Sequence, residues 1–413
     1  MITRHRCSNG VTIVLEKIPA VRSVSIGVWV GTGSRNETKE NNGVSHFLEH
    51  MFFKGTTSRN AREIAEAFDR IGGHVNAFTS KEYTCFYSKV LDEHAEHALD
   101  LLADMFFHST FSADEMIKEK SVVHEEIKMY EDTPDEMVHD LLGQACYGDH
   151  PLGYPILGSE KVLDSFDSRT LRDYMKKSYT PDNVVISIAG HIDESIITYA
   201  EQFFGGFHGE SGAAPTESPV FRTDKLARRK DTEQAHLCVG FRGLPVNHEE
   251  IFTLAVLNNI LGGSMSSRLF QEVREERGLA YSIFSYHSAF RDNGVLSIYG
   301  GTGVDRVDEM YTTVHEVLAK LRSGGVTDSE LENSKEQIKG NLMLGLESTN
   351  SRMNLNAKNE MFLGRHRTLD EMTEDIAAVT KTRVNAMAEA IFSEDFSCSI
   401  VSPGGKLPRV LQV

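Results

Sequence analysis

Cysteine is sparse in this chain of 413 residues. The cysteines stand singly, their number is odd, and no two of them form a CxxC pair. They are Cys7, Cys85, Cys146, Cys238 and Cys398. This pattern argues against a disulfide framework and against a zinc cluster built from thiolates. Because the start of the chain also lacks the apolar segment of a secretory signal, we expect a cytoplasmic protein in a reducing compartment.

Long apolar runs and basic clusters are missing as well. No run of about 18 apolar residues occurs, so we expect no membrane-spanning segment. The chain has 43 Lys and Arg against 60 Asp and Glu, a formal net charge of −17, and its longest basic cluster is ARRK at residues 227–230. Such a charge repels nucleic acid and anionic membranes and attracts cationic ligands, although acidity also serves solubility alone. We therefore expect a peptide as the partner, and neither nucleic acid nor a membrane.

The middle of the chain has the composition of an interdomain linker. Residues 205–219 (GGFHGESGAAPTESP) concentrate Gly, Ser and Pro without the periodicity of a helix or a strand. The chain as a whole is 40% hydrophobic and 25% charged, which is typical of a folded protein. We expect an N-terminal domain at residues 1–208, a linker at residues 209–219 and a C-terminal domain at residues 220–413.

The two halves show the same order of apolar patterns: a strand, two helices and two further strands. In the first half these patterns cover residues 24–30, 44–53, 61–71, 74–80 and 84–91, and in the second half residues 235–241, 252–261, 267–276, 281–288 and 294–301. Two longer helices, at residues 93–106 and 112–130, complete the first half. We expect an α+β fold of two homologous α/β-sandwich domains, each a mostly antiparallel sheet flanked by helices.

A metal-binding pattern lies in the first helix after the first apolar strand. His46 and His50 are four residues apart, so on a helix both imidazoles project from one face and can share one cation. Glu49 lies on the same side, where a carboxylate can activate a metal-bound water without binding the metal. The flanking residues are strongly apolar, so this buried helix carries polar groups that need partners, and a metal satisfies them together.

A catalytic zinc site needs a third protein ligand and one open position. The helix expected at residues 112–130 offers four candidates, which are Glu115, Glu119, Glu125 and Glu126. Glu119 and Glu126 lie on one stripe of that helix, about two turns apart, and both can face inward. The spacing alone leaves the choice among these carboxylates open.

Five motifs resemble those of the insulinase and mitochondrial-processing-peptidase family of metallopeptidases. They are HFLEHMFFKGT at residues 46–56, GGHVNAFTSKEYTCFY at residues 72–87, EKSVVHEEI at residues 119–127, HPLGYPILG at residues 150–158 and EVREERGLAYS at residues 272–282. The motifs lie in both halves of the chain. The likeness is greatest to the short processing proteases of Bacillus-type bacteria.

The resemblance implies a zinc site with one ion per chain. His46, His50 and Glu126 match the family's zinc ligands, and Glu49 matches its general base. Glu119 matches an acidic position that lies near the metal and its water.

The resemblance also implies residues that bind substrate. Arg274 and Tyr281 match the Arg and Tyr that reach the active site and stabilise the scissile carbonyl. Asn76, Ala77, Phe78 and Thr79 match an edge strand along which an extended peptide lies. Of the residues that follow, we expect Lys81 and Glu82 to be solvated, although Glu82 also matches a recurrent acidic position of the family motif.

Together these matches imply a zinc-dependent endopeptidase that cuts unfolded peptides or exposed protein segments in an enclosed chamber. Family chambers hold four such domains and this chain has two, so the resemblance implies a homodimer whose sites are completed in trans. The alternative is a catalytically silent scaffold subunit of the same fold. The presence of both histidines, Glu49 and a distal glutamate favours the enzyme.

Overall fold

The computed structural model describes residues 2–209 and 217–412. The chain divides into two compact units. The first consists of Met1–Lys128, Tyr154–Glu217 and Gly345–His366, and the second of Met129–Gly153, Ser218–Leu344 and Arg367–Val413. Each unit therefore contains a segment from the other half of the sequence.

The first unit is built on a six-stranded sheet with the order β1-β2-β6-β3-β5-β4. Its strands are β1 (Ile2–Arg6), β2 (Thr12–Lys17), β3 (Ser23–Val30), β4 (His74–Thr79), β5 (Thr84–Leu91) and β6 (Val184–Gly190). Only the pairing of β2 with β6 is parallel. Strand β4 pairs with β5 alone and forms one edge of the sheet.

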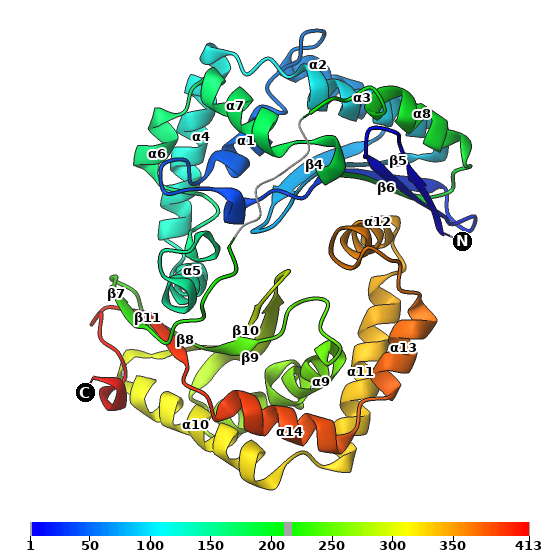
Figure 1. Ribbon diagram of the computed structural model, residues 1–413. Coiled ribbons are helices and arrows are strands. Elements are labelled where there is room, and N and C mark those ends of the chain that lie inside the picture. Colours follow the sequence, from blue (N-terminus) through cyan, green and yellow to red (C-terminus); the bar gives the residue numbers. More distant parts are fainter. Residues whose placement is uncertain (1, 210–216, 413) are drawn as a thin grey trace. The chain divides into compact units, whose positions relative to one another are not determined.

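Alternate residues of β3 face two different layers of the first unit. Val24, Ile26, Val28 and Val30 are fully buried in the main core, together with side chains of α1 and α3. Helices α2, α3 and α8 are drawn on this face of the sheet in Figure 1. The helices of the unit's N-terminal segments are α1 (Val44–Met51), α2 (Ala61–Arg70), α3 (Ala95–His108), α4 (Ala113–Glu131), α6 (Glu160–Ser165), α7 (Ser168–Ser178) and α8 (Ser195–Phe204).

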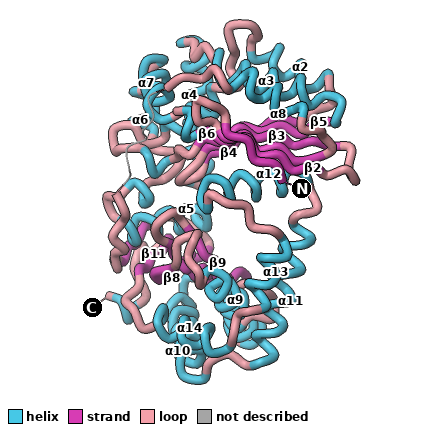
Figure 2. The backbone as a smooth tube through the Cα atoms, turned by 45° about the vertical axis from the view of Figure 1, so that its right-hand side comes forward, coloured by secondary structure: helices cyan, strands magenta, loops and turns pink. Residues whose placement is uncertain are grey.

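Helix α12 (Thr349–Lys358), from the C-terminal half, covers the other face of this sheet. Figures 1 and 2 both show it beside the strands of the first unit. The indole nitrogen of Trp29 donates to Met353 Sδ at 3.1 Å, and both residues are fully buried. Gly27 allows the close approach, because a Cβ there would lie 2.5 Å from Met353 Sδ.

The second unit is built on a five-stranded sheet with the order β7-β11-β8-β10-β9. Its strands are β7 (Lys225–Arg229), β8 (Gln234–Gly243), β9 (Ala280–Ala289), β10 (Gly294–Gly303) and β11 (Ser397–Ser402). The pairing of β7 with β11 is parallel, and the others are antiparallel. The helices of its C-terminal segments are α9 (Ile251–Gly262), α10 (Val307–Gly324), α11 (Asp328–Gly345), α13 (Leu369–Ala377) and α14 (Lys381–Phe392).

Helix α5 (Pro134–Tyr147), from the N-terminal half, packs against β8 and β11 of the second unit. Its Leu142 and Cys146 are buried beside Gly240 of β8, where a Cβ would lie 3.1 Å from Leu142 Cδ1. Gly240 thus has the same role under α5 as Gly27 has under α12. In both units a glycine in a central strand admits a helix from the other half of the chain.

The expected fold class is confirmed: each unit is a mostly antiparallel sheet flanked by helices. The compact units are not the continuous ranges 1–208 and 220–413, because α5 and α12 each bury their apolar side against the sheet formed by the other half. Most of the expected linker, residues 210–216, lies outside the described residues. Among the described residues, no helix is both long and apolar enough to cross a membrane.

Candidate metal centre

Helix α1 carries the two histidines of the HxxEH pattern on the inner side of the first unit. The apolar residues Phe47, Leu48 and Met51 are fully buried and fix this helix in the core. His46 and His50, one turn apart, then point to a common position.

Three donor atoms converge there. His46 Nε2 lies 3.3 Å from His50 Nε2, and Glu126 Oε2 of α4 lies 3.6 Å from the first nitrogen and 3.5 Å from the second. Ligand atoms about 2.0–2.1 Å from a tetrahedral zinc ion are separated by about 3.3–3.4 Å. The spacing of the three donors therefore fits a zinc ion, and the two imidazoles and one carboxylate match the donor set of open catalytic zinc sites.

The structure separates the four candidate carboxylates of α4. Glu125 is exposed and pairs with Lys128 at 2.7 Å, and Glu115 pairs with Lys118 at 2.6 Å. Glu126 instead faces the two histidines. Glu119, two turns earlier, is only 4% exposed.

Glu119 forms a hydrogen bond with the ring nitrogen of His50 that faces away from the candidate metal position. Its Oε1 accepts a hydrogen bond from His50 Nδ1 at 2.8 Å, and its Oε2 lies 2.7 Å from Lys54 Nζ. Burial alone would raise the pKa of Glu119, but the hydrogen bonds from His50 and Lys54 outweigh it and lower that pKa. An ionised Glu119 fixes the His50 tautomer in which the Nε2 lone pair is free for a metal.

The pKa values of the two histidines are shifted in opposite directions. Burial, followed by repulsion from His50, lowers the pKa of His46 to about 4. Burial would also lower the pKa of His50, but its hydrogen bonds to Glu119 and Glu126 prevail and raise that pKa to about 9. The shifts differ in sign because His50 contacts two carboxylates, whereas burial dominates at His46.

Glu49 is half-buried beside the ligand set. Thr79, the last residue of β4, donates a hydrogen bond to Glu49 Oε2 at 2.5 Å. Burial raises the pKa of Glu49. A carboxyl group whose pKa lies above its ordinary value is suited to accept and return a proton near neutral pH.

Strand β4 brings the substrate-binding candidates next to this carboxylate. Asn76, Ala77, Phe78 and Thr79 pair with Tyr87, Phe86, Cys85 and Thr84 of β5. The opposite edge of β4 has no partner strand in the described part of the chain. An extended peptide can hydrogen-bond to such an edge.

Sequence reasoning missed Glu37, which holds the start of α1. This carboxylate is 2% exposed and accepts hydrogen bonds from the backbone of Ser45 and Gly43, each at 2.8 Å. The side-chain amide of Asn42 also donates a hydrogen bond to the Glu37 carboxylate, at 2.9 Å. The same amide donates to the carbonyl of Pro155, in the HPLGYPILG motif. Glu37 stands outside the helix and six residues before Gly43, so no local capping pattern identifies it.

The expectation that Glu82 is solvated is wrong. Its carboxylate is buried and lies 2.6 Å from the guanidinium of Arg35, also buried. Lys81 donates a hydrogen bond to the carbonyl of Tyr154. Pairing with Arg35 offsets the cost of burying Glu82, and the ion pair fixes the turn between β4 and β5.

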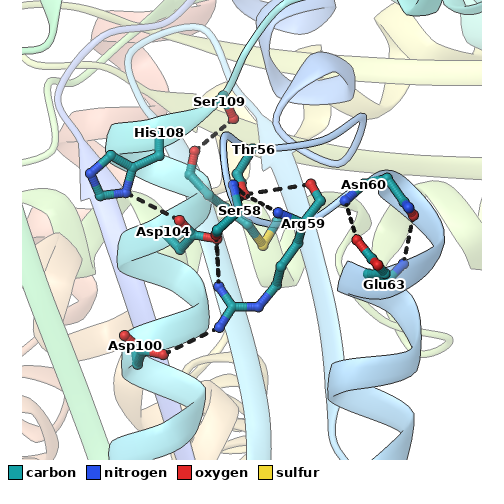
Figure 3. Close-up of polar contacts among 10 residues, drawn as sticks. Thr56, Ser58, Arg59, Asn60, Glu63, Asp100, Asp104, His108 and Ser109 are labelled. Atoms are coloured by element: carbon teal, nitrogen blue, oxygen red, sulfur yellow. Dashed lines mark hydrogen bonds and ion pairs between the residues drawn. The ribbon is translucent and has the colours of Figure 1, made fainter.

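The loop between α1 and α2 contains Lys54 and is anchored on α3 (Figure 3). Asp104 of α3 accepts hydrogen bonds from Thr56 Oγ1 at 2.8 Å, Ser58 Oγ at 2.9 Å and Arg59 Nη1 at 2.6 Å. Burial would raise the pKa of Asp104, but these donors lower it. These hydrogen bonds hold the loop that contains Lys54 in place on α3.

Arg274 and Tyr281 lie together in the second unit. The Arg274 guanidinium is 4.7 Å from the centre of the Tyr281 ring and 4.6 Å from that of Phe270. Tyr281 is 79% exposed, and its hydroxyl faces solvent rather than a core. The structure thus places Arg274 and Tyr281 in contact with each other.

Comparison with known proteins identifies the family. The description "Insulinase (Peptidase family M16)" matches residues 12–160, and "Peptidase M16 inactive domain" matches residues 165–338. The uncharacterized zinc protease YmxG of Bacillus subtilis is 62% identical over 99% of this chain and 100% of its own length. The chain belongs to peptidase family M16. The family resemblance expected from the sequence is thus confirmed.

Other M16 relatives cover the chain equally fully. An uncharacterized zinc protease of Mycobacterium leprae is 37% identical over 100% of this chain and 95% of its own length. The crystal structure of a protease from Helicobacter pylori superposes with a TM-score of 0.90 at 21% identity, over 98% of this chain and 99% of that one. At that identity the likeness shows a shared fold alone.

Proposed function

We propose that this M16 protein is a zinc-dependent endopeptidase with one zinc ion per chain, acting in the cytoplasm. The single observation that carries the proposal is the convergence of His46, His50 and Glu126, with donor atoms 3.3 to 3.6 Å apart. The zinc-protease names of the relatives support the choice of metal.

The proposed roles follow from the geometry. His46, His50 and Glu126 would hold the ion, which when bound supplies a Lewis acid that acidifies water and polarises the peptide carbonyl. Glu49 takes the proton of the attacking water and returns it to the leaving amine. The hydrogen bond from Thr79 holds one oxygen of Glu49 in place, leaving the other for this transfer.

The proposed substrates are extended segments of unfolded peptides or exposed protein chains. Backbone pairing with β4 gives affinity with little demand on sequence, and Thr79 links that strand to Glu49. A tightly folded domain has no free extended segment to present. Short unfolded peptides are therefore expected to be cut and disulfide-stapled domains to resist.

The proposed assembly is a homodimer in which the second unit of one chain completes the site of its partner. Tyr281 offers an exposed hydroxyl and Arg274 a cation, which are donors suited to a developing oxyanion. The cation–π contact between them holds the pair as one group. A closed twofold dimer would give two equivalent sites, each completed across the interface.

The test compares Glu49→Gln with Glu125→Gln, a matched change on an exposed carboxylate. Glu49→Gln is expected to keep one zinc per chain and to lose cleavage of a quenched-peptide library. Glu125→Gln is expected to keep both zinc and peptide cleavage. Glu126→Gln is expected to lose zinc. Full activity in Glu49→Gln would refute the proposed base, and a wild-type protein without peptidase activity would favour the scaffold alternative.

A further inference from the structure

A second group of metal-binding side chains lies in the first unit, at the sheet edge opposite β4. His5 is on β1, Cys7 follows that strand directly, and Glu201 is on α8. One donor atom of each lies within 4.8 Å of the others. Strand β1 and strand β4 are the two outermost strands of the sheet, so this group is separate from the HxxEH site.

The group is partly shielded from water. Cys7 is 3% exposed. The His5 side chain is 37% exposed, but its Nε2 atom is buried. This atom lies 3.2 Å from Glu201 Oε2, an ion-pair distance, and has no partner in hydrogen-bond geometry among the described residues. A buried imidazole nitrogen without a hydrogen bond costs free energy, and a metal ion is one way to satisfy it.

The backbone already holds the two elements together. Cys7 begins a tight turn in which its N–H donates to the carbonyl of Val11 at 2.9 Å. Asn9 in the same turn donates to the carbonyls of Phe204 and Phe207 at 2.7 and 2.9 Å. The turn is therefore fixed on the C-terminal end of α8, the helix that carries Glu201, before any ion binds.

We propose that His5, Cys7 and Glu201 form a second binding site, for a thiophilic divalent cation such as Zn²⁺. A thiolate, an imidazole and a carboxylate suit zinc, whereas calcium and magnesium prefer oxygen ligands alone. Adjacent donors around a zinc ion with a thiolate ligand are about 3.5 Å apart. The Glu201 side chain is 44% exposed, so it can rotate to close the remaining distance. The bound ion ties the first strand to α8 and stabilises the first unit.

The experiment loads the metal-free, full-length protein with Co²⁺ in a His46→Ala background, which removes the HxxEH site. One bound cobalt per chain is expected, with the near-ultraviolet charge-transfer band of a thiolate ligand. No cysteine belongs to the HxxEH donor set, so this band reports on the second site. Because the described cysteines are all free and buried, Cys7→Ser assigns the band to one of them.

Cys7→Ser is expected to abolish the band, and Glu201→Gln to remove the rise in melting temperature that Co²⁺ gives. His97→Gln on the exposed face of α3 is the matched control for His5→Gln, and only the latter should weaken binding. Absence of the band in the His46→Ala protein, or its persistence in Cys7→Ser, overturns the proposal. If Cys7→Ser fails to fold, an unchanged thermal shift in Glu201→Gln overturns it instead. None of these readouts depends on peptidase activity.

Discussion

Lys54 Nζ lies 2.7 Å from Glu119 Oε2, while the other oxygen of that carboxylate accepts the Nδ1 proton of His50. The chain of contacts runs from a loop through α4 to a proposed metal ligand on α1. Lys54 keeps the buried Glu119 ionised, and Glu119 in turn orients His50. Lys54 is thus a positioning residue that acts through Glu119.

Lys54→Met is expected to weaken zinc binding or peptidase activity by about 10–100-fold, because the carboxylate that orients His50 loses its cation. Zinc affinity measured by competition with a chelator checks this. Lys118→Met removes an exposed lysine that pairs with Glu115 of the same helix and should change neither quantity. A Lys54→Met protein with wild-type zinc affinity and kcat would show that Glu119 needs no such support.

Local patterns predicted much of the fold and the core of the site. The strand expected at residues 24–30 is β3, and the helix expected at residues 44–53 is α1, because burial on one face imposes a periodicity that a short window reveals. His46 and His50 were found for the same reason, since their spacing is that of one helical turn.

Apart from Glu37, whose partners Asn42, Gly43 and Ser45 are close in sequence, the residues and contacts that sequence reasoning missed depend on partners distant in the chain. Helix α12 covers a sheet whose strands lie more than a hundred residues earlier, and its pattern alone names no partner. Glu82 looks like a solvated turn residue until Arg35, which is 47 positions away, is brought beside it. The third ligand could be chosen among four carboxylates only by resemblance. Adjacent helix positions differ in direction by about 100°, but which of them faces the histidines of α1 depends on how α4 packs.

Gly27→Ala is expected to destabilise the protein by about 1–3 kcal/mol through overpacking beneath α12. The added Cβ would lie 2.5 Å from Met353 Sδ and 2.6 Å from the indole nitrogen of Trp29, so the helix or the strand must shift. Denaturant unfolding measures the change. Gly340→Ala in α11 is the control, because a Cβ there meets no atom within 4 Å. Equal stability of Gly27→Ala and wild type would show that α12 does not pack closely on β3.

The second unit is expected to lose stability in acid through Glu330. Burial would raise the pKa of Glu330, but hydrogen bonds from Arg268 and from the backbone of Thr327 lower it to about 2. A carboxyl group with a lowered pKa in the folded state stabilises the fold above its unfolded pKa, and that stabilisation is lost as pH falls toward 2. The side chains of Arg268 and Glu330 are themselves partly exposed, so screening by solvent reduces the effect.

As the pH is lowered from about 5 to about 2, the midpoint of unfolding is therefore expected to fall less steeply in Glu330→Gln than in wild type. Glu332→Gln provides the matched control, since Glu332 is exposed and its contact with Lys335 is a surface ion pair. Parallel pH profiles for wild type and Glu330→Gln would contradict the assignment.

Complementation between inactive chains tests the proposed dimer. Glu49→Gln removes the proposed base of the first unit, and Tyr281→Phe removes the exposed hydroxyl of the second. If the second unit acts on the partner's site, each mixed dimer has one site that joins an intact first unit to an intact Tyr281. Random pairing makes half of the dimers mixed, and half of their sites are complete, so activity should return to about a quarter of wild type. Glu49→Gln mixed with itself supplies the background, and size-exclusion chromatography of differently tagged chains verifies exchange. If the mixture remains inactive despite exchange, or if an isolated monomer cleaves peptide, then Tyr281 does not act across a dimer.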